Sequence, residues 1–263
     1  MTLGERMKEY EFQSRTRLLR RTPVIIRLDG CHFHTWTRGL DRPYDKELME
    51  IMQKTMLALC TQIQGCVLGY TQSDEITLVL VDYKRLESMA WYDNQVQKMC
   101  SVAASIATNA FNEALQDVIE GLYIEAQWAK QNSWDEEEMN CISKAQLLET
   151  KRYKANFDAR AFNLPKEEVV NNLIWRQQDC TRNSINLLAQ SLYSHKELQG
   201  INSKDLQNKM LVEKNVNWNN ERTDFKRGAC AIKDNEGKWF VDVNIPIFTE
   251  QRFYITDLIK EEV

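Results

Sequence analysis

The sequence predicts an α+β fold built on a ferredoxin-like βαββαβ unit, with a helical and β-hairpin extension after it. Three observations lead to this prediction. Over residues 1–164, short β-branched runs and longer stretches of helical periodicity follow one another in the order strand, helix, strand, strand, helix, strand. The middle two strands are separated by only a few turn residues, which indicates a hairpin. The 263 residues include only 4 Pro and 9 Gly, which favours a helix-rich chain with few long loops.

The first elements are a basic helix, a strand and a second helix. Residues 5–20 have apolar positions at helical spacing among arginines and lysines, and Pro23 ends this helix. Residues 24–30 form a β-branched run that a glycine stops, which is typical of a strand. The next helix begins at Asp45, whose side chain is expected to cap it, and Gly65 closes it.

The central hairpin and a long helix complete the unit. The hairpin strands are predicted over 66–71 and 76–81, and the helix runs from about residue 91 to 115 or further. Residues 131–141 contain an acidic run and are predicted to be a solvated loop. Residues 157–164 alternate apolar and polar side chains and therefore form the last strand of the unit.

The remaining residues, 165–263, are predicted to pack on the first unit as part of one continuous domain. Helical periodicity covers about 166–193 and 203–212. Two short strands over 229–233 and 239–243 flank a turn and form a terminal hairpin.

Charge and cysteine content limit the class of protein. The chain has 34 Lys and Arg and 38 Asp and Glu, so its formal net charge is −4. This charge excludes binding to nucleic acid through bulk positive charge. Seven scattered cysteines without metal-ligand spacing are typical of reduced thiols in the cytoplasm. Because charged residues begin at Glu5, we expect no signal peptide. The sequence also has no run of the ~20 apolar residues that a membrane span needs. We expect a cytoplasmic protein without a membrane partner.

Two aspartates should meet at one edge of the sheet. In the predicted topology the first strand lies beside the third, so Asp29 at the end of strand 24–30 approaches Asp74 at the hairpin tip. Paired carboxylates suit Mg²⁺, and two such ions can clamp the oxygens of a phosphoryl or nucleotidyl transfer. The Gly30 carbonyl is a further candidate ligand. Cations near in sequence could hold a triphosphate, and they are Arg27, His34, Arg42 and Lys46.

Other interpretations stay open for these residues. Asp-Gly after a strand and Ser-Asp-Glu in a hairpin are also ordinary turn sequences. A zinc site of Asp29, His32 and His34 lacks a fourth ligand. Glu75 follows Asp74, so pleating is expected to point it to the other face, and it is kept as a candidate catalytic residue.

An ordered set of motifs from about residue 5 to 232 resembles the tRNA-His guanylyltransferase family and its guanylyltransferase-like relatives. The matching segments are Arg27-Leu28-Asp29-Gly30-Cys31-His32-Phe33-His34, Arg42-Pro43-Tyr44-Asp45, Gly69-Tyr70-Thr71-Gln72-Ser73-Asp74-Glu75, Phe157-Asp158-Ala159-Arg160, Trp175-Arg176-Gln177-Gln178-Asp179-Cys180, Leu198-Gln199-Gly200, Asn217-Trp218-Asn219-Asn220-Glu221 and Lys226-Arg227-Gly228.

The resemblance implies a polymerase-type palm that extends tRNA in the 3′-to-5′ direction. ATP or GTP would activate the tRNA 5′-phosphate, and the 3′-hydroxyl of an incoming nucleoside triphosphate would then attack it, with two Mg²⁺ ions. The metal ligands implied are Asp29, the Gly30 carbonyl and Asp74. The nucleotide would be held by Asp29, Gly30, Cys31, His32, Phe33, His34, Ser73 and Asp74, with Arg27, Arg42 and Asp45 beside them. A homotetramer, as a dimer of dimers, is also implied.

One departure from the family pattern bears on the substrate. Where eukaryotic members carry His-Ile-Asn-Asn, a segment associated with choosing tRNA-His, this chain has Thr181-Arg182-Asn183-Ser184. The chain thus resembles the bacterial and archaeal like-proteins, which repair 5′-truncated tRNAs against a template. The alternatives are a dedicated tRNA-His guanylyltransferase, a nucleotide cyclase and a non-catalytic RNA-binding module. Residues 131–150 look like a local insertion. The cations expected to contact tRNA are Arg160, Arg176, Arg182, Lys204, Lys209, Lys226 and Arg227.

Overall fold

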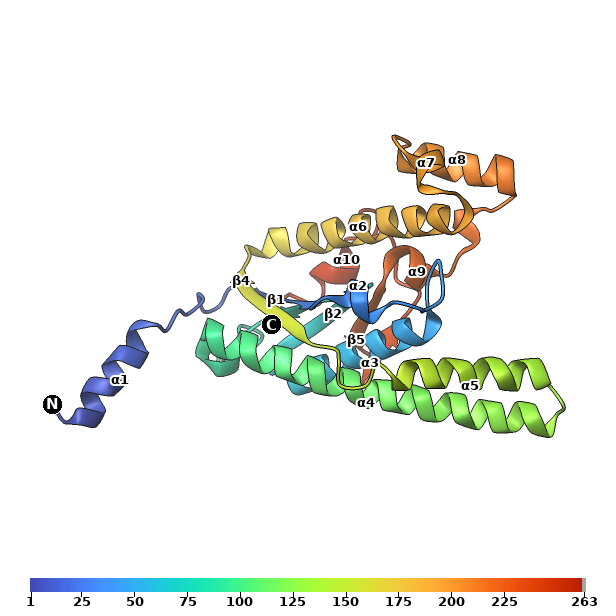
Figure 1. Cartoon of the computed structure of the whole chain (residues 1–263). Coiled ribbons are helices and arrows are strands. Elements are labelled where there is room, and N and C mark those ends of the chain that lie inside the picture. Colours follow the sequence, from blue (N-terminus) through green and yellow to red (C-terminus); the bar gives the residue numbers. More distant parts are fainter. Residues whose placement is uncertain (262–263) are drawn as a thin grey trace.

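The computed structural model describes residues 1–261 and has a mixed α/β architecture around one six-stranded antiparallel sheet (Figure 1). The strand order is β4-β1-β3-β2-β5-β6. The strands are β1 (Val24–Gly30), β2 (Cys66–Gln72), β3 (Glu75–Leu80), β4 (Phe157–Asn163), β5 (Ala229–Lys233) and β6 (Trp239–Asp242).

Helices account for most of the rest of the described chain. The longer ones are α1 (Leu3–Gln13), α3 (Lys46–Gln62), α4 (Val96–Gln131), α5 (Asp135–Glu149), α6 (Lys166–Leu192) and α8 (Ser203–Lys214). Short helical turns are α2 (Phe33–Trp36), α7 (His195–Leu198), α9 (Thr223–Arg227) and α10 (Phe253–Thr256), with 3₁₀ turns at Trp91–Asn94 and Trp218–Asn220.

Helices cover both faces of the sheet because alternate strand residues are apolar on both sides. Ile26 and Leu28 of β1 belong to the core that α3, α4 and α5 complete. Ile25 of the same strand belongs to a second core with Val169 and Leu173 of α6. Asp29 shares the strand parity of Ile25, so its side chain lies on the face that α6 covers.

Two expected pairings in the sheet are confirmed: β1 pairs with β3, and β2 pairs with β3 through the hairpin. On its other side β1 pairs with β4. β5 of the extension pairs with β2, so residues after 165 continue the same sheet.

The first helix is shorter than predicted. α1 ends at Gln13, because the next residues bind elsewhere in the fold: the Val96 N–H donates to the Thr16 carbonyl at 3.0 Å, and the Leu18 N–H donates to the Asn94 carbonyl at 3.0 Å. α1 buries none of its residues and projects from the body of the molecule (Figure 1).

The solvated loop predicted over 131–141 was wrong. α4 continues to Gln131 and turns back into α5, and the two helices form a long antiparallel arm (Figure 1). The acidic run Asp135–Glu138 occupies the first turn of α5, where the helix dipole favours carboxylates. Ala145 and Leu148 anchor the other end of α5 in the core.

Two general expectations can be compared with the described residues. All seven cysteines are unpaired, in agreement with the prediction of reduced thiols. Over residues 1–261, every helix is too short or too polar to cross a bilayer.

Candidate functional site

The end of β1 and the tip of the β2–β3 hairpin meet as the topology predicts. The Gly30 N–H donates a hydrogen bond of 3.1 Å to the Asp74 carbonyl. In the sheet register, Asp29 stands between Glu75 of β3 and Asp158 of β4. Several carboxylates from three strands therefore gather at this edge of the sheet.

The charges at this edge are unbalanced. Burial raises the pKa of Asp74, and the negative charge of Asp29 raises it further, while hydrogen bonds to its backbone and to the Ser73 hydroxyl act in the opposite direction. Among residues 1–261, neither Asp29 nor Asp74 forms an ion pair with a protein cation. A bound cation would relieve this repulsion, which makes the edge a candidate metal site.

Glu75 lies on the same face as Asp29, so the expectation that pleating turns it away was wrong. The reason is that Asp74 belongs to the turn, whereas Glu75 is the first residue of β3 and stands directly opposite Asp29. Its Oε2 lies 2.8 Å from Nη1 of Arg176 on α6, and both side chains are largely buried. The carboxylate of Glu75 is thus already paired with a protein cation.

The chain after Asp29 is shaped by close packing. A Cβ on Gly30 would lie 2.3 Å from the Phe33 ring, so only glycine fits there. The Phe33 ring is buried and stacks on Trp36, which leaves only its backbone for contact with a ligand. The Cys31 N–H donates to the Asn156 carbonyl at 2.8 Å, whereas the side chains of His32 and His34 are exposed.

The zinc interpretation receives no support. Within residues 1–261, the one group of three potential ligands close enough to share an ion is Asp41, Asp45 and Glu47, not Asp29 with the two histidines. Asp45 caps α3 as predicted, because its carboxylate accepts the Leu48 N–H.

A cavity of about 300 Å³ opens beside the hairpin tip. We call it the tip cavity. Its walls come from the hairpin, from the loop before α3 and from α6. The residues that line it include Arg42, Tyr44, Asp45, Ser73, Asn183 and Ser184. The segment in which this chain departs from the family pattern therefore contributes to the cavity wall.

The cations predicted to contact tRNA differ in exposure. Arg160, Arg182 and Lys204 are exposed, and Lys209 and Arg227 are half-buried. Arg176 and Lys226 are buried, which does not fit the expectation that these two side chains contact tRNA. Arg176 pairs with Glu75, and Lys226 donates to the Asn219 carbonyl at 2.5 Å. Sequence reasoning missed these roles because their partners come from other segments of the chain.

A family model described as tRNAHis guanylyltransferase matches residues 4–165, which is more than half of the chain. The chain belongs to the tRNAHis guanylyltransferase family. This membership confirms the resemblance found in the motifs and places the chain among tRNA nucleotidyltransferases.

Relatives of known structure resemble the chain over nearly its full length. A bacterial tRNA(His) guanylyltransferase-like protein in complex with ATP is 39% identical and has a TM-score of 0.81, covering 98% of this chain and 99% of that one. A bacterial like-protein in complex with GTP is 36% identical with a TM-score of 0.76, covering 97% and 98%. A relative found by sequence comparison, the probable tRNA(His) guanylyltransferase of Homo sapiens, is 25% identical over 88% of this chain and 72% of that protein.

Proposed function

We propose that the chain is a template-dependent 3′-to-5′ nucleotidyltransferase that repairs 5′-truncated tRNA. The observation that carries this proposal is the convergence of Asp29 and Asp74 at one sheet edge, beside the tip cavity, in a member of this family. The palm-like role of the sheet belongs to the same proposal.

The donor set at the sheet edge fits Mg²⁺. The two carboxylates are hard oxygen ligands without a protein cation among the described residues, and the negative charge of Asp29 helps to raise the pKa of Asp74. Asp29, Asp74 and the Gly30 carbonyl would hold two ions. Bound Mg²⁺ supplies neutralising charge to phosphate oxygens during transfer.

The proposed reaction has two transfers. In the first, an oxygen of the tRNA 5′-phosphate attacks the α-phosphorus of ATP or GTP, and pyrophosphate leaves. In the second, the 3′-hydroxyl of the incoming nucleoside triphosphate attacks the activated tRNA phosphate, and the nucleoside monophosphate leaves. The ATP and GTP complexes of the bacterial relatives support these substrates. Arg42 and Ser73 line the tip cavity, where they would orient the activating nucleotide.

The segment 181–184 favours repair over a dedicated tRNA-His activity. Asn183 and Ser184 line the tip cavity, and Arg182 beside them is exposed. A chain without the His-Ile-Asn-Asn segment loses the residues associated with selecting tRNA-His. Single addition of G to tRNA-His is therefore the second candidate, and nucleotide cyclisation is the third.

One assay separates these candidates. Several tRNAs that lack their 5′-terminal nucleotide are incubated with each of the four nucleoside triphosphates and ATP. The repair activity adds whichever nucleotide pairs with the opposite strand, in every tRNA. Addition of G alone to tRNA-His alone would establish the dedicated enzyme instead, and a cyclic nucleotide formed without tRNA would establish a cyclase.

The same assay tests the aspartates. Asp29→Ala and Asp74→Ala should each reduce nucleotide addition by roughly 10³-fold, since a metal ligand supplies several kcal/mol to the transition state. Binding of tRNA should remain within about threefold, because the carboxylates repel phosphate and contribute no affinity. Turnover close to that of the unsubstituted enzyme would refute the metal assignment.

The expected tetramer and cytoplasmic location are further parts of the proposal. Light scattering of the purified protein over a range of concentrations tests the first, and cell fractionation tests the second.

A further inference from the structure

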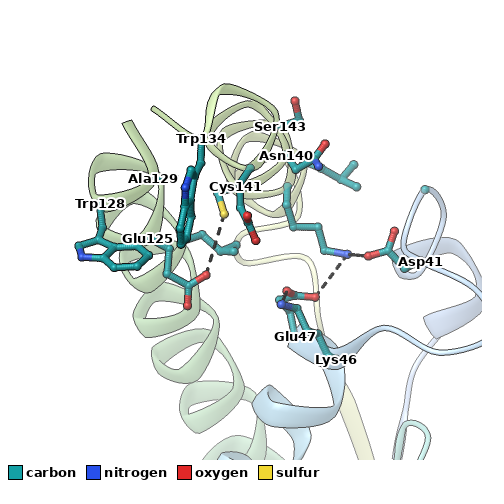
Figure 2. A pocket seen from close by; sticks show the side chains of 15 residues that line it. Asp41, Lys46, Glu47, Glu125, Trp128, Ala129, Trp134, Asn140, Cys141 and Ser143 are labelled. Atoms are coloured by element: carbon teal, nitrogen blue, oxygen red, sulfur yellow. Dashed lines mark hydrogen bonds and ion pairs between the residues drawn. The ribbon is translucent and has the colours of Figure 1, made fainter. Parts of the chain in front are cut away.

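A largely buried lysine side chain connects the α4–α5 arm to the loop before α3. Nζ of Lys144 on α5 lies 2.6 Å from Oδ2 of Asp41 and 3.5 Å from Oε2 of Glu47, and it also pairs with Asp45. The Lys144 side chain is only 12% exposed. Figure 2 shows this region, in which dashed lines mark the ion pairs of Asp41 and Glu47.

Asp45 is the point at which these contacts meet. One carboxylate oxygen accepts the Leu48 N–H at 2.9 Å and begins α3. The other accepts the Asp41 N–H at 3.0 Å, which closes the loop 41–45, and also pairs with Lys144. Both oxygens of Asp45 are therefore engaged by the protein, so Asp45 shapes the loop that it ends.

The loop 41–45 separates two cavities. On one side lies the tip cavity, which Arg42, Tyr44 and Asp45 help to line. On the other side lies a cavity of about 680 Å³ between the arm and the start of α3 (Figure 2). Asp41 lines both cavities, and Lys144, which pairs with it, lines the larger one.

The charges explain why the lysine is held there. The carboxylates of Asp41, Asp45 and Glu47 lie within 4.8 Å of one another, a spacing that would also suit a metal ion. The ammonium group of Lys144 pairs with all three. Burial opposes its charge, but hydrogen bonds to Asp41 and Asp45 raise the pKa of Lys144 overall, and the pKa of Asp45 is lowered overall despite burial. Both partners are thus charged at neutral pH.

We propose that Lys144 is a positioning residue that locks the loop 41–45 to the α4–α5 arm and thereby sets the affinity of the tip cavity for its nucleotide. This inference rests on the proposed function, which places the activating nucleotide in that cavity. The arm thus serves as a rigid support for one wall of the nucleotide site.

The test compares Lys144→Met with Lys130→Met, which removes an exposed lysine from the same arm. Lys144→Met should raise the KM for ATP roughly tenfold and change kcat less than about twofold, because the loop is displaced while the aspartates stay in place. Lys130→Met should change neither, and Lys144→Arg should restore most of the affinity.

Hydrogen exchange supplies a second readout that needs no turnover. The amides of Asp41 and Leu48 both donate to Asp45 and should exchange about tenfold faster in Lys144→Met than in Lys130→Met. If Lys144→Met fails to fold, Asp41→Asn weakens the same lock while it leaves the Asp45 cap in place, and the same two measurements apply.

The outcomes distinguish this inference from the proposed function. Unchanged exchange in Lys144→Met overturns the lock, and faster exchange with an unchanged KM overturns its effect on nucleotide affinity. Absence of nucleotide addition by the unsubstituted enzyme refutes the proposed function. In that case, equilibrium dialysis still measures the affinity of the two methionine variants for ATP. Weaker binding by Lys144→Met than by Lys130→Met supports the lock, and equal binding rejects it.

Discussion

At the scale of single residues, the neighbouring acidic side chains Asp74 and Glu75 at the sheet edge differ in their ion pairing. Glu75 is neutralised by Arg176 at 2.8 Å, whereas Asp74 has no such partner among the described residues and lies near the charge of Asp29. Burial raises the pKa of both carboxyl groups and the charge of Asp29 adds to this, but among the described residues only Glu75 pairs with an arginine that favours its ionised form. Such a difference is typical of sites at which charge is reserved for a ligand.

The first prediction concerns Asp74 and pH. Because the folded-state pKa of Asp74 is raised above 3.8, its ionised form destabilises the metal-free protein. This destabilisation is absent below the unfolded pKa and is fully present above the folded pKa. Asp74→Asn should therefore raise the Tm at pH 7.5 in EDTA, and the gain should shrink as the pH falls toward about 4.

Magnesium provides the matching control for Asp74. Added Mg²⁺ should raise the Tm of the unsubstituted protein and should raise that of Asp74→Asn much less, since one ligand is lost. A gain in Tm that stays the same at every pH would contradict the electrostatic explanation.

The second prediction concerns the buried ion pair. Arg176→Met leaves the charge of Glu75 without its partner in a largely buried position, which should lower the free energy of unfolding by about 3–5 kcal/mol. Urea denaturation measures this change. Arg182→Met, six residues further along α6, removes a side chain that is 61% exposed and should change stability by less than about 0.5 kcal/mol.

A double variant tests the cause of this loss. Adding Glu75→Gln to Arg176→Met removes the unpaired charge and should recover a large part of the stability. If the double variant is as unstable as the sum of the two single variants, packing and not charge is what Arg176 contributes.

At the scale of elements, the α4–α5 arm is the main feature that the sequence did not predict. Its second helix begins with four acidic residues and has only two buried side chains, Ala145 and Leu148. These two residues nevertheless fix α5 to the main core, and from there Lys144 reaches the loop before α3.

The third prediction tests that anchoring. Leu148 is completely buried, so Leu148→Ala should lower the free energy of unfolding by about 2–5 kcal/mol through lost burial and a cavity. Met139 lies on the same helix but is 67% exposed, and Met139→Ala should have little effect. Equal effects in thermal or urea denaturation would mean that α5 is not packed as described.

The elements also show what the sequence could predict. Strand and helix periodicity is local, so β1, the β2–β3 hairpin and α6 were predicted within a few residues, and with them the meeting of Asp29 and Asp74. α5 was missed because its apolar pattern is weak. The pairs Arg176–Glu75 and Lys144–Asp45 join residues 101 and 99 positions apart, and no local signal specifies such partners.

At the scale of the whole molecule, one sheet connects both parts of the chain. β5 pairs with β2 from Gly69 to Thr71, and α6 covers the face that Ile25, Leu68 and Val79 present. The boundary predicted near residue 164 is therefore crossed by main-chain hydrogen bonds and by a buried core. We infer that the parts 1–164 and 165–263 depend on each other for stability.

The fourth prediction follows from this shared core. A chain that ends at residue 164 would expose side chains that are fully buried here, among them Ile25, Leu68, Tyr70 and Val79. Each lost burial removes about 1.5–3 kcal/mol, and a domain has only about 5–15 kcal/mol of stability in total. Residues 1–164 alone should therefore lack a cooperative thermal transition, whereas the full chain should unfold in one transition with coincident far-UV circular dichroism and tryptophan fluorescence. Two separated transitions in the full chain, or a cooperative one in residues 1–164, would instead show that the first unit is stable by itself and that the extension is docked on it.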